Sequence, residues 1–348
     1  MSRNSLYLSG LIVVTALALH GQTQPPTTGA QYWSTSSSLD CSSLLYNTPV
    51  PITNAAGTTI GYSCLVSGTF LYFAAGGGWG SAIRVAAPAS APVGVDYTFY
   101  DVNGNAVSLD TTGSLTQSSS DVNFALNTNQ PSEIDLAGAT GNGPSYNSTA
   151  VGTVYAEFLC PDSTTCLNVL PQLIYSNLPT HPWALSVPIT WDDNVWTQWS
   201  AEGIDDGIGV HTVSLAIYNE DTQATSYKVS VYDSSGNLAG TGTTPSVPPL
   251  QNLGNGSYGE GGVFAASLRS IVPTLPSGTF KVYIDGGSLF SAAEVLQFYG
   301  PTATTLQVAY DGTEADLAPT SRTAAPARLN ARRRAAPASM PLFRPLPK

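Results

Sequence analysis

The sequence predicts an all-β protein built from two tandem antiparallel β-sandwiches, and three observations favour this fold class. Charged residues make up only 10% of the 348 residues, while Gly, Pro, Ser and Thr are abundant. Such a composition suits many short strands joined by turns. Apolar residues alternate with polar ones over short runs and show no helical period. A block of sequence also recurs along the chain, which indicates a duplicated unit.

Residues 1–21 have the pattern of a secretory signal peptide. Arg3 supplies positive charge, and residues 6–19 form an apolar run of 14 residues. A membrane span needs about 20 apolar residues, so this run is too short for one. No other segment is long and apolar enough. We therefore expect a secreted protein, extracellular or periplasmic, with no transmembrane segment once the signal is removed.

Residues 22–64 are expected to form an extended N-terminal segment. Separately, the chain has an even number of cysteines, which favours disulfides. Exported proteins meet an oxidising compartment in which thiols pair. The cysteines are Cys41, Cys64, Cys160 and Cys166. Three pairings are open, and the short loops that they close favour Cys41–Cys64 and Cys160–Cys166, the second across a hairpin tip. A zinc site is disfavoured because the CxxC spacing and a nearby His are missing.

The repeat aligns residues 81–105 with residues 213–237 at a constant offset of 132. Residues at i, i+2 and i+4 share one face of a strand, so each copy should bury the same face. The residues expected inside are Ile83, Val85, Val95, Tyr97 and Phe99 in the first copy, and Leu215, Ile217, Tyr227, Val229 and Val231 in the second. A second match aligns residues 152–160 with 278–286. These matches place one sandwich at 65–180 and the other at 181–312.

Three motifs resemble those of tandem immunoglobulin-like β-sandwich repeat proteins that bacteria secrete. They are FAAGGGW at 73–79, FYDVNGN at 99–105 and LPSGTFKV at 275–282. The resemblance covers about residues 65–310 and implies an immunoglobulin-like form for both sandwiches. The family is of unknown function, so the resemblance implies no catalytic residues.

The Tyr-Asp-x-x-Gly-Asn stretch occurs in both copies of the repeat and fits a hairpin turn better than a calcium loop. An EF-hand loop has Gly at its sixth position and a bidentate Glu at its twelfth. Counted from Asp101, the Gly comes fourth and the twelfth residue is Thr112. The hairpin needs only a residue that tolerates positive φ, which Gly104 and Gly236 supply.

The segment 191–206 carries the strongest candidate binding residues. Its tryptophans are Trp191, Trp196 and Trp199, half of the six in the chain. Exposed aromatic rings can stack on sugar faces, whereas the alternative is that these residues cover the junction between the sandwiches. Its candidate calcium ligands are Asp192, Asp193, Asp205 and Asp206. The alternative for them is a set of solvated loop acids. Calcium is the only cofactor that the sequence suggests.

Charge is unevenly distributed along the chain. Residues 22–310 hold four cations and 20 acids. An acidic body repels phosphate backbones, so nucleic acid is not an expected partner of the folded part. Residues 313–348 are rich in Ala, Pro and Arg and are predicted to be a disordered tail.

No hydrolase motif is present. The sequence has neither G-x-S-x-G nor H-E-x-x-H, which favours a protein that is not an enzyme. The leading hypothesis is therefore a secreted, non-catalytic protein with a surface-association, adhesion or extracellular structural role, whose partners are extracellular polysaccharide or other surface proteins. One alternative is a carbohydrate-binding module that uses residues 191–199. A second alternative is an extracellular hydrolase with an unrecognised carboxylate site, for which Glu133 and Glu157 are candidates.

Overall fold

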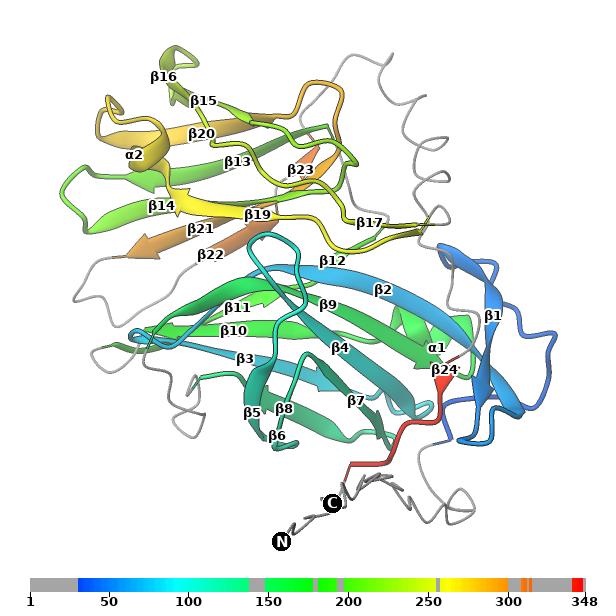
Figure 1. Ribbon diagram of the computed structural model, residues 1–348. Helices are drawn as coiled ribbons and strands as arrows, with labels where there is room; N and C mark the ends of the chain where they lie inside the picture. Colours follow the sequence, from blue (N-terminus) through cyan, green and yellow to red (C-terminus); the bar gives the residue numbers. More distant parts are fainter. Residues whose placement is uncertain are drawn as a thin grey trace, which may run out of the picture.

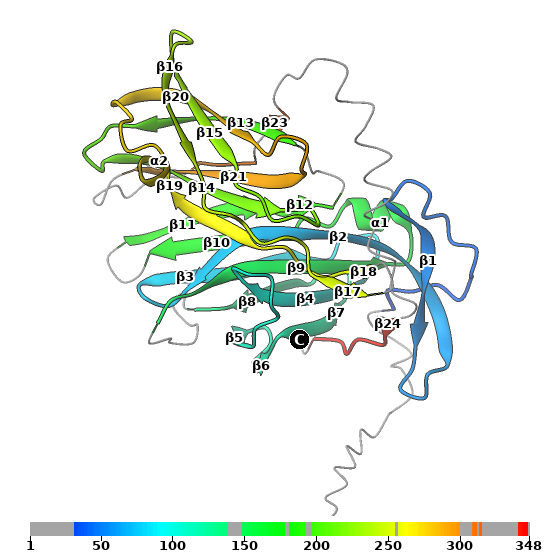
Figure 2. The same ribbon diagram turned by 45° about the horizontal axis from the view of Figure 1, so that its top comes forward.

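The computed structural model describes residues 31–137, 148–177, 181–192, 197–254, 257–299, 308–311, 313–314 and 340–346. The described chain is mostly strands in several antiparallel sheets, so the all-β prediction is confirmed. The sheets form two stacked bodies, one above the other (Figures 1 and 2). The expected signal peptide, residues 1–21, lies outside the described residues. Within those residues, no helix is long and apolar enough to cross a membrane.

The first body pairs a seven-stranded sheet with a six-stranded sheet. The first of these contains, in spatial order, β24 (Met340–Pro341), β1 (Tyr46–Thr53), β2 (Thr59–Ala75), β9 (Ala150–Cys160), β4 (Val93–Asp101) and β7 (Asp121–Leu126), with β12 (Thr190–Trp191) pairing with β2. The second contains β11 (His181–Pro188), β10 (Gln172–Asn177), β3 (Trp79–Ala86), β8 (Pro131–Asp135), β5 (Leu109–Gly113) and β6 (Gln117–Ser119). A short helix, α1 (Ser163–Leu167), follows β9.

The second body pairs a five-stranded sheet with a four-stranded sheet. The five-stranded sheet contains β16 (Leu238–Thr243), β15 (Lys228–Asp233), β20 (Gly278–Asp285), β13 (Gln198–Asp205) and β23 (Thr313–Glu314). The four-stranded sheet contains β19 (Val263–Ser267), β14 (His211–Asn219), β21 (Ser291–Tyr299) and β22 (Val308–Asp311). A small ribbon of β17 (Asn252–Gly254) and β18 (Ser257–Tyr258) and the short helix α2 (Leu268–Ile271) complete this body.

The two bodies, called here the first and second sandwich, share a strand order around their central strands. In the first sandwich β9 lies between β4 and β2, as β20 lies between β15 and β13 in the second. In the opposite sheets β3 lies between β8 and β10, as β14 lies between β19 and β21. The recurring sequence blocks therefore fall on corresponding strands.

The pairing register of the corresponding strands differs by two residues. Asp101 lies opposite Gly152, whereas Asp233 lies opposite Phe280, two residues beyond the aligned Gly278. Because side chains alternate with a period of two, an even shift keeps each residue on its original face of the sheet. The ten residues predicted to point inward are accordingly at most 3% exposed and belong to two separate cores.

Strand pairing places the limits of the first sandwich differently from the sequence-based prediction. Residues 22–64 were expected to be an extended leader, but β1 and the start of β2 already belong to the seven-stranded sheet. The expected boundary at 180/181 falls between β10 and β11, which pair with each other. Pro182 lies in β11, an edge strand, where a missing backbone N–H is tolerated. The first sandwich therefore continues to Trp191, and the second begins with β13.

Both disulfides join the cysteines that the sequence favoured, Cys41–Cys64 and Cys160–Cys166. The second disulfide spans α1 instead of a hairpin tip. The Asp162 carboxylate caps this helix by accepting the backbone N–H of Thr165 at 2.7 Å. Since Cys64 lies opposite Cys160 in the β2–β9 pair, the two cross-links stand side by side.

The predicted disorder of residues 313–348 is wrong for the part that the structure describes. Residues 313–314 form β23, and residues 340–346 pack against the first sandwich. The side chains of Met340, Phe343 and Leu346 are at most 5% exposed. Burial of these three apolar side chains stabilises the docked segment. The average composition of the whole tail, on which the prediction was based, does not reveal so short an apolar stretch. Residues 315–339 lie outside the described residues.

Candidate functional site

The tryptophans of segment 191–206 do not form an exposed aromatic platform. Trp199 is 1% exposed, and its Nε1 donates to the carbonyl oxygen and the hydroxyl of Ser291, each at 3.1 Å. It is a core residue of the second sandwich, so its prediction as a ligand-binding residue is wrong. Trp191 is half-buried, with its ring edge-to-face on Phe158 at 6.0 Å. Trp196 lies outside the described residues.

Asp192 is held on the outer face of the seven-stranded sheet. Its Oδ2 accepts the hydroxyls of Ser67 at 2.5 Å, Tyr46 at 3.1 Å and Tyr155 at 3.4 Å. These three donors come from β2, β1 and β9, so Asp192 ties together strands of the first sandwich. Asp193 lies outside the described residues.

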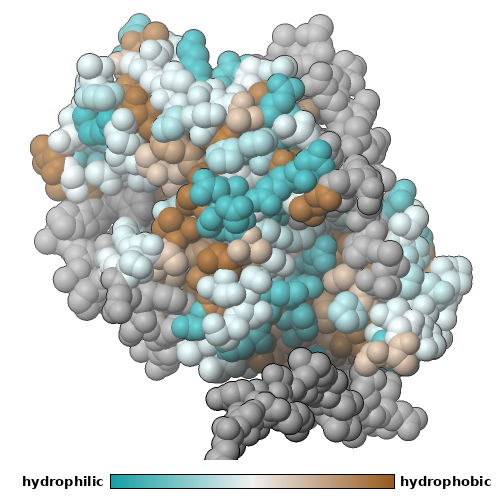
Figure 3. Space-filling view, viewed as in Figure 1, coloured by the Kyte–Doolittle hydropathy of each residue, from teal (hydrophilic) through white to brown (hydrophobic). Residues whose placement is uncertain are grey.

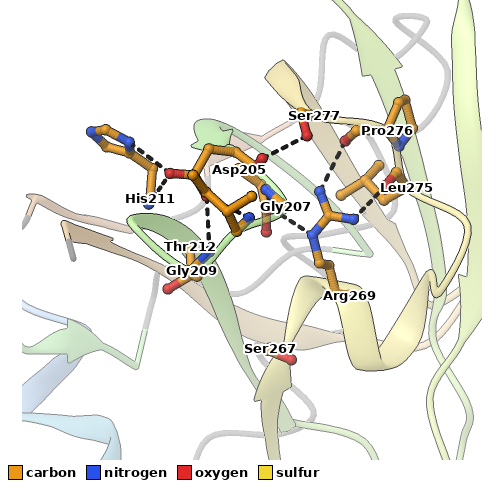
Figure 4. A network of polar contacts seen from close by, with 12 residues as sticks. Asp205, Gly207, Gly209, His211, Thr212, Ser267, Arg269, Leu275, Pro276 and Ser277 are labelled. Atoms are coloured by element: carbon orange, nitrogen blue, oxygen red, sulfur yellow. Dashed lines mark hydrogen bonds and ion pairs between the residues drawn. The ribbon is translucent and has the colours of Figure 1, made fainter. Parts of the chain in front are cut away.

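Asp205 and Asp206 order a loop at one end of the second sandwich (Figure 4). Asp205 is 1% exposed and accepts Arg269 Nε at 2.6 Å, while the same guanidinium donates to the carbonyls of Leu275 and Pro276. Asp206 accepts four backbone N–H groups, from residues 208–211, and the His211 ring at 3.1 Å. Desolvation raises the pKa of the Asp206 carboxyl, but these hydrogen bonds outweigh it, and its pKa lies below the ordinary value.

The candidate calcium ligands therefore serve separate structural roles where the structure describes them. Asp192 binds hydroxyls of the first sandwich, whereas Asp205 and Asp206 bind an arginine and a loop of the second. Across the described part of the chain, no group of three or more His, Cys, Asp or Glu side chains is placed to hold a metal ion. Since Asp193 lies outside the described residues, calcium binding by this segment stays a prediction.

The two Tyr-Asp-x-x-Gly-Asn stretches are hairpin turns, as predicted. Asp101 Oδ1 accepts the backbone N–H groups of Asn103 and Asn105, and Asp233 Oδ1 accepts those of the two corresponding residues, all at 2.8–2.9 Å. Gly104 and Gly236 have φ angles of +79° and +82°. Each carboxylate is thus already hydrogen-bonded within its own turn, and a cation would have to compete with these N–H donors for the carboxylate oxygens.

A different surface, the outer face of β13, β20 and β15, forms an open groove of about 820 Å³. We call this surface the open groove. Lys281 lies opposite Glu202 on one side and Tyr232 on the other. The rings of Tyr232 and Tyr283 meet edge-to-face at 5.4 Å, and the Lys281 ammonium lies 5.3 Å from the centre of the Tyr283 ring. Two half-exposed aromatic rings therefore stand among hydrogen-bonding side chains of both charges.

The open groove also holds both lysines of the acidic body. Residues 22–310 contain only four cations, Arg84, Lys228, Arg269 and Lys281. The two arginines are paired with carboxylates, Glu133 and Asp205 respectively. Among the described residues, neither lysine lies within ion-pair distance of a carboxylate, and both are exposed. Their ammonium groups are therefore available to hydroxyl or carboxylate oxygens of a ligand.

The corresponding face of the first sandwich is covered. Thr153, Tyr155 and Leu159 point outward from β9 and are at most 6% exposed, whereas Thr279 and Lys281 in the aligned stretch of β20 are exposed. The covering groups are Asp192, Tyr32 and the 340–346 segment. The second sandwich also covers part of this face, because Leu71 of β2 packs into the core of the second sandwich.

A cluster of carboxyl groups lies on this covered face. Asp96 is paired with Glu157 in the β4–β9 register and is hydrogen-bonded to Asp121. Its Oδ1 atom is buried. Burial first, and then the negative charges of Asp121 and Glu157, raise the pKa of Asp96 to about 9. Glu133, the other acid considered for glycoside hydrolysis, lies in the opposite sheet beside Arg84, so it does not converge with Glu157.

A smaller hollow of about 290 Å³ lies between the sandwiches. Tyr72, Trp79 and Leu215 are among its lining residues. The Tyr175 hydroxyl donates to the backbone carbonyl of Tyr72 inside it, and burial holds the pKa of Tyr175 well above its ordinary value. The hollow belongs to the packing between the two bodies.

Sequence reasoning missed the open groove for a definite reason. Tyr232 belongs to the second Tyr-Asp-x-x-Gly-Asn stretch and Lys281 to the LPSGTFKV motif, but their proximity depends on the pairing of β15 with β20. Two outward positions on aligned strands were the only available signal. Comparison with known protein families, with curated proteins and with solved structures finds no match to this chain.

Proposed function

We propose that this protein is a secreted, non-catalytic binding protein that attaches to extracellular polysaccharide through the open groove of its second sandwich. The observation that carries the proposal is the cluster of two half-exposed rings, Tyr232 and Tyr283, with the exposed Lys281 in the open groove. Aromatic rings with one apolar face and a polar edge suit sugar rings, which have apolar faces and hydroxyl rims.

Three further features support a surface-association role outside the cell. The first is the signal-peptide pattern of residues 1–21, and the second is the pair of disulfides, which persist in oxidising compartments. The third is the repeated immunoglobulin-like sequence pattern, because repetition of one sandwich allows one copy to serve as a support and the other as a binding surface. The carbohydrate-binding alternative thus moves from residues 191–199 to the open groove.

The test is affinity electrophoresis of the whole protein through gels that contain one polysaccharide each, neutral or acidic. Tyr232→Ala should weaken the retardation by about tenfold in apparent Kd, because it removes a stacking face. Tyr100→Ala is the matched control, since Tyr100 occupies the aligned position in the first sandwich and is not part of the open groove, and it should leave the retardation unchanged. Equal retardation of both variants and the wild type, or none at all, would contradict the proposal.

The same material distinguishes the hydrolase alternative. Incubation of the retained polysaccharide with the protein should produce no new reducing ends if the groove only binds. Release of reducing ends that Glu202→Gln abolishes would replace the binding proposal by a hydrolytic one, because Glu202 is an exposed carboxylate in the groove.

A further inference from the structure

The segment 340–346, called here the docking segment, lies between the two edge strands of the seven-stranded sheet. Its first residues pair in parallel with β1, where Met340 lies opposite Ile52. Its later residues reach β7, where Pro345 forms a bridge to Ala125. In Figure 1 this red segment runs from the end of β1 toward β7. It therefore occupies the sheet edges that strand addition uses.

Main-chain hydrogen bonds attach the docking segment at both edges. Leu342 N donates to the Thr53 carbonyl at 3.0 Å on the β1 side. On the β7 side, Ala125 N donates to the Arg344 carbonyl at 2.8 Å, and Leu346 N donates to the Ala125 carbonyl at 3.0 Å. Such bonds are independent of side-chain identity, so they provide affinity, while the side chains provide selection.

Three apolar side chains at intervals of three residues provide that selection. Met340, Phe343 and Leu346 are 5%, 3% and 5% exposed. The Phe343 ring stacks on Tyr32 at 5.6 Å, and the Phe343 N–H donates to the Tyr32 hydroxyl at 2.8 Å. Gly94 provides the space for both rings, because a Cβ there would lie 2.9 Å from Tyr32 and 3.1 Å from Phe343. The sheet thus contains a shaped site for this short peptide.

The docking segment follows the second sandwich in the chain but makes these contacts with the first sandwich. Glu314, the last described residue before it, belongs to β23 of the second sandwich, and 25 residues separate it from Met340. Every hydrogen bond from the segment to the described residues goes to Tyr32 or to the first sandwich. The contacts are therefore the same whichever copy of the chain supplies the segment.

We propose that the docking segment is exchangeable, and that the site between β1 and β7 accepts it from a second copy of this chain. Exchange of an identical element between protomers needs no new interface. The segment and the site belong to one chain, so docking within that chain is favoured over docking between chains in dilute solution. The segment therefore binds its own chain in dilute solution, and copies link to one another where the chain is concentrated, as on a surface covered with the protein.

Complementation between two full-length variants tests the proposal. Phe343→Asp leaves the site intact but prevents its own segment from docking, because a carboxylate cannot replace the buried ring. Ala125→Pro leaves the segment intact but removes the donor to Arg344 at the edge of β7, where proline is tolerated. Each variant alone should be a monomer by native mass spectrometry at high micromolar concentration. A 1:1 mixture should form a heterodimer, and a mixture that stays monomeric would overturn the proposal.

A labelled peptide of residues 339–348 keeps the test decisive if a variant fails to fold. Added in large excess to the wild-type chain, it should displace the resident segment at equilibrium, as a fluorine label on the peptide reports by NMR without removal of the free peptide. The same peptide with Phe343→Asp should bind at least about tenfold more weakly. Equal binding of the two peptides, or no binding of either, would show that the site does not recognise a segment supplied from outside.

Discussion

The two sandwiches carry corresponding outer sheet faces that have opposite surroundings. On β9 the face is buried under Asp192, the docking segment and the second sandwich. Asp96 on the neighbouring strand β4 lies opposite Glu157 of β9, and the pKa of its carboxyl group is raised to about 9. On β20 the face is open and presents lysines and tyrosines. The two faces arise from aligned sequence blocks. Their difference shows that the segments packed on a sheet face, more than the alternation of residues along its strands, decide which copy of a repeat remains available for binding.

The same contrast applies to the two hairpin turns. The backbone hydrogen bonds that the two aspartates accept match one for one. A Cβ on Gly104 would lie 2.6 Å from the carbonyl oxygen of Glu260 in the second sandwich, whereas a Cβ on Gly236 would have no atom within 4 Å. One turn therefore helps to join the sandwiches, and the other projects freely.

The largest expected effect is the difference between Gly104→Ala and Gly236→Ala. Both replace a glycine at positive φ, which costs about 1 kcal/mol. Only the first also forces a methyl group into the backbone of residues 260–261, which adds about 2 kcal/mol. Urea unfolding of both variants measures this difference. Equal losses of stability would mean that the junction yields without cost.

The next effect concerns the pH dependence of Asp96, whose pKa is raised in the folded state. The folded chain keeps this proton up to about pH 9, whereas the unfolded chain loses it near the ordinary value of about 4. For this group, stability is therefore greatest below about pH 4 and falls as the pH rises between these values.

Asp96→Asn should abolish this loss, so its Tm should exceed that of the wild type at pH 7 and approach it at pH 4. Thermal unfolding at a series of pH values gives both curves. Glu202→Gln on the open face is the control and should leave the curve unchanged. Parallel curves for Asp96→Asn and the wild type would show that this carboxyl group is ionised in the folded protein.

The smallest effect isolates one hydrogen bond across the junction. Gln251 Nε2 donates to Asn105 Oδ1 at 2.9 Å. Hydrophilic residues form a band across the middle of the view in Figure 3. Asn105 and Asn237 also make the same contact with the aspartate of their own turns. Asn105→Ala should therefore destabilise the protein by about 0.5 kcal/mol more than Asn237→Ala does. Gln251→Ala should reproduce this difference, and its failure to do so would assign the difference to the turn itself.

The sequence predicted the strands well where one face is buried. Alternation identified the inward residues of β4 and β15, and the repeat predicted that the second sandwich would present the same face. Short loop lengths also led to the correct disulfides. These features depend on neighbours in sequence or on a period of two, both of which can be read from a single chain.

The features that the sequence did not predict depend on contacts between distant residues. Trp191 and Trp199 are only eight residues apart in the sequence, yet Trp199 is a core residue and Trp191 lies half-buried on Phe158. The docking segment contains four apolar side chains beside two prolines, and its contacts are with residues more than 200 positions away in the chain. Local composition contains no information on such partners.

The docking segment also sets an order in time for folding. The hydroxyl of Tyr32 and the backbone of Phe343 are 311 residues apart in the chain. Contacts this distant form slowly, because a long loop must close before they contribute. The first sandwich is therefore synthesised first and completed last. Until residues 340–346 arrive, the outer edges of β1 and β7 stay unpaired, and the nascent chain is most vulnerable to aggregation during that interval.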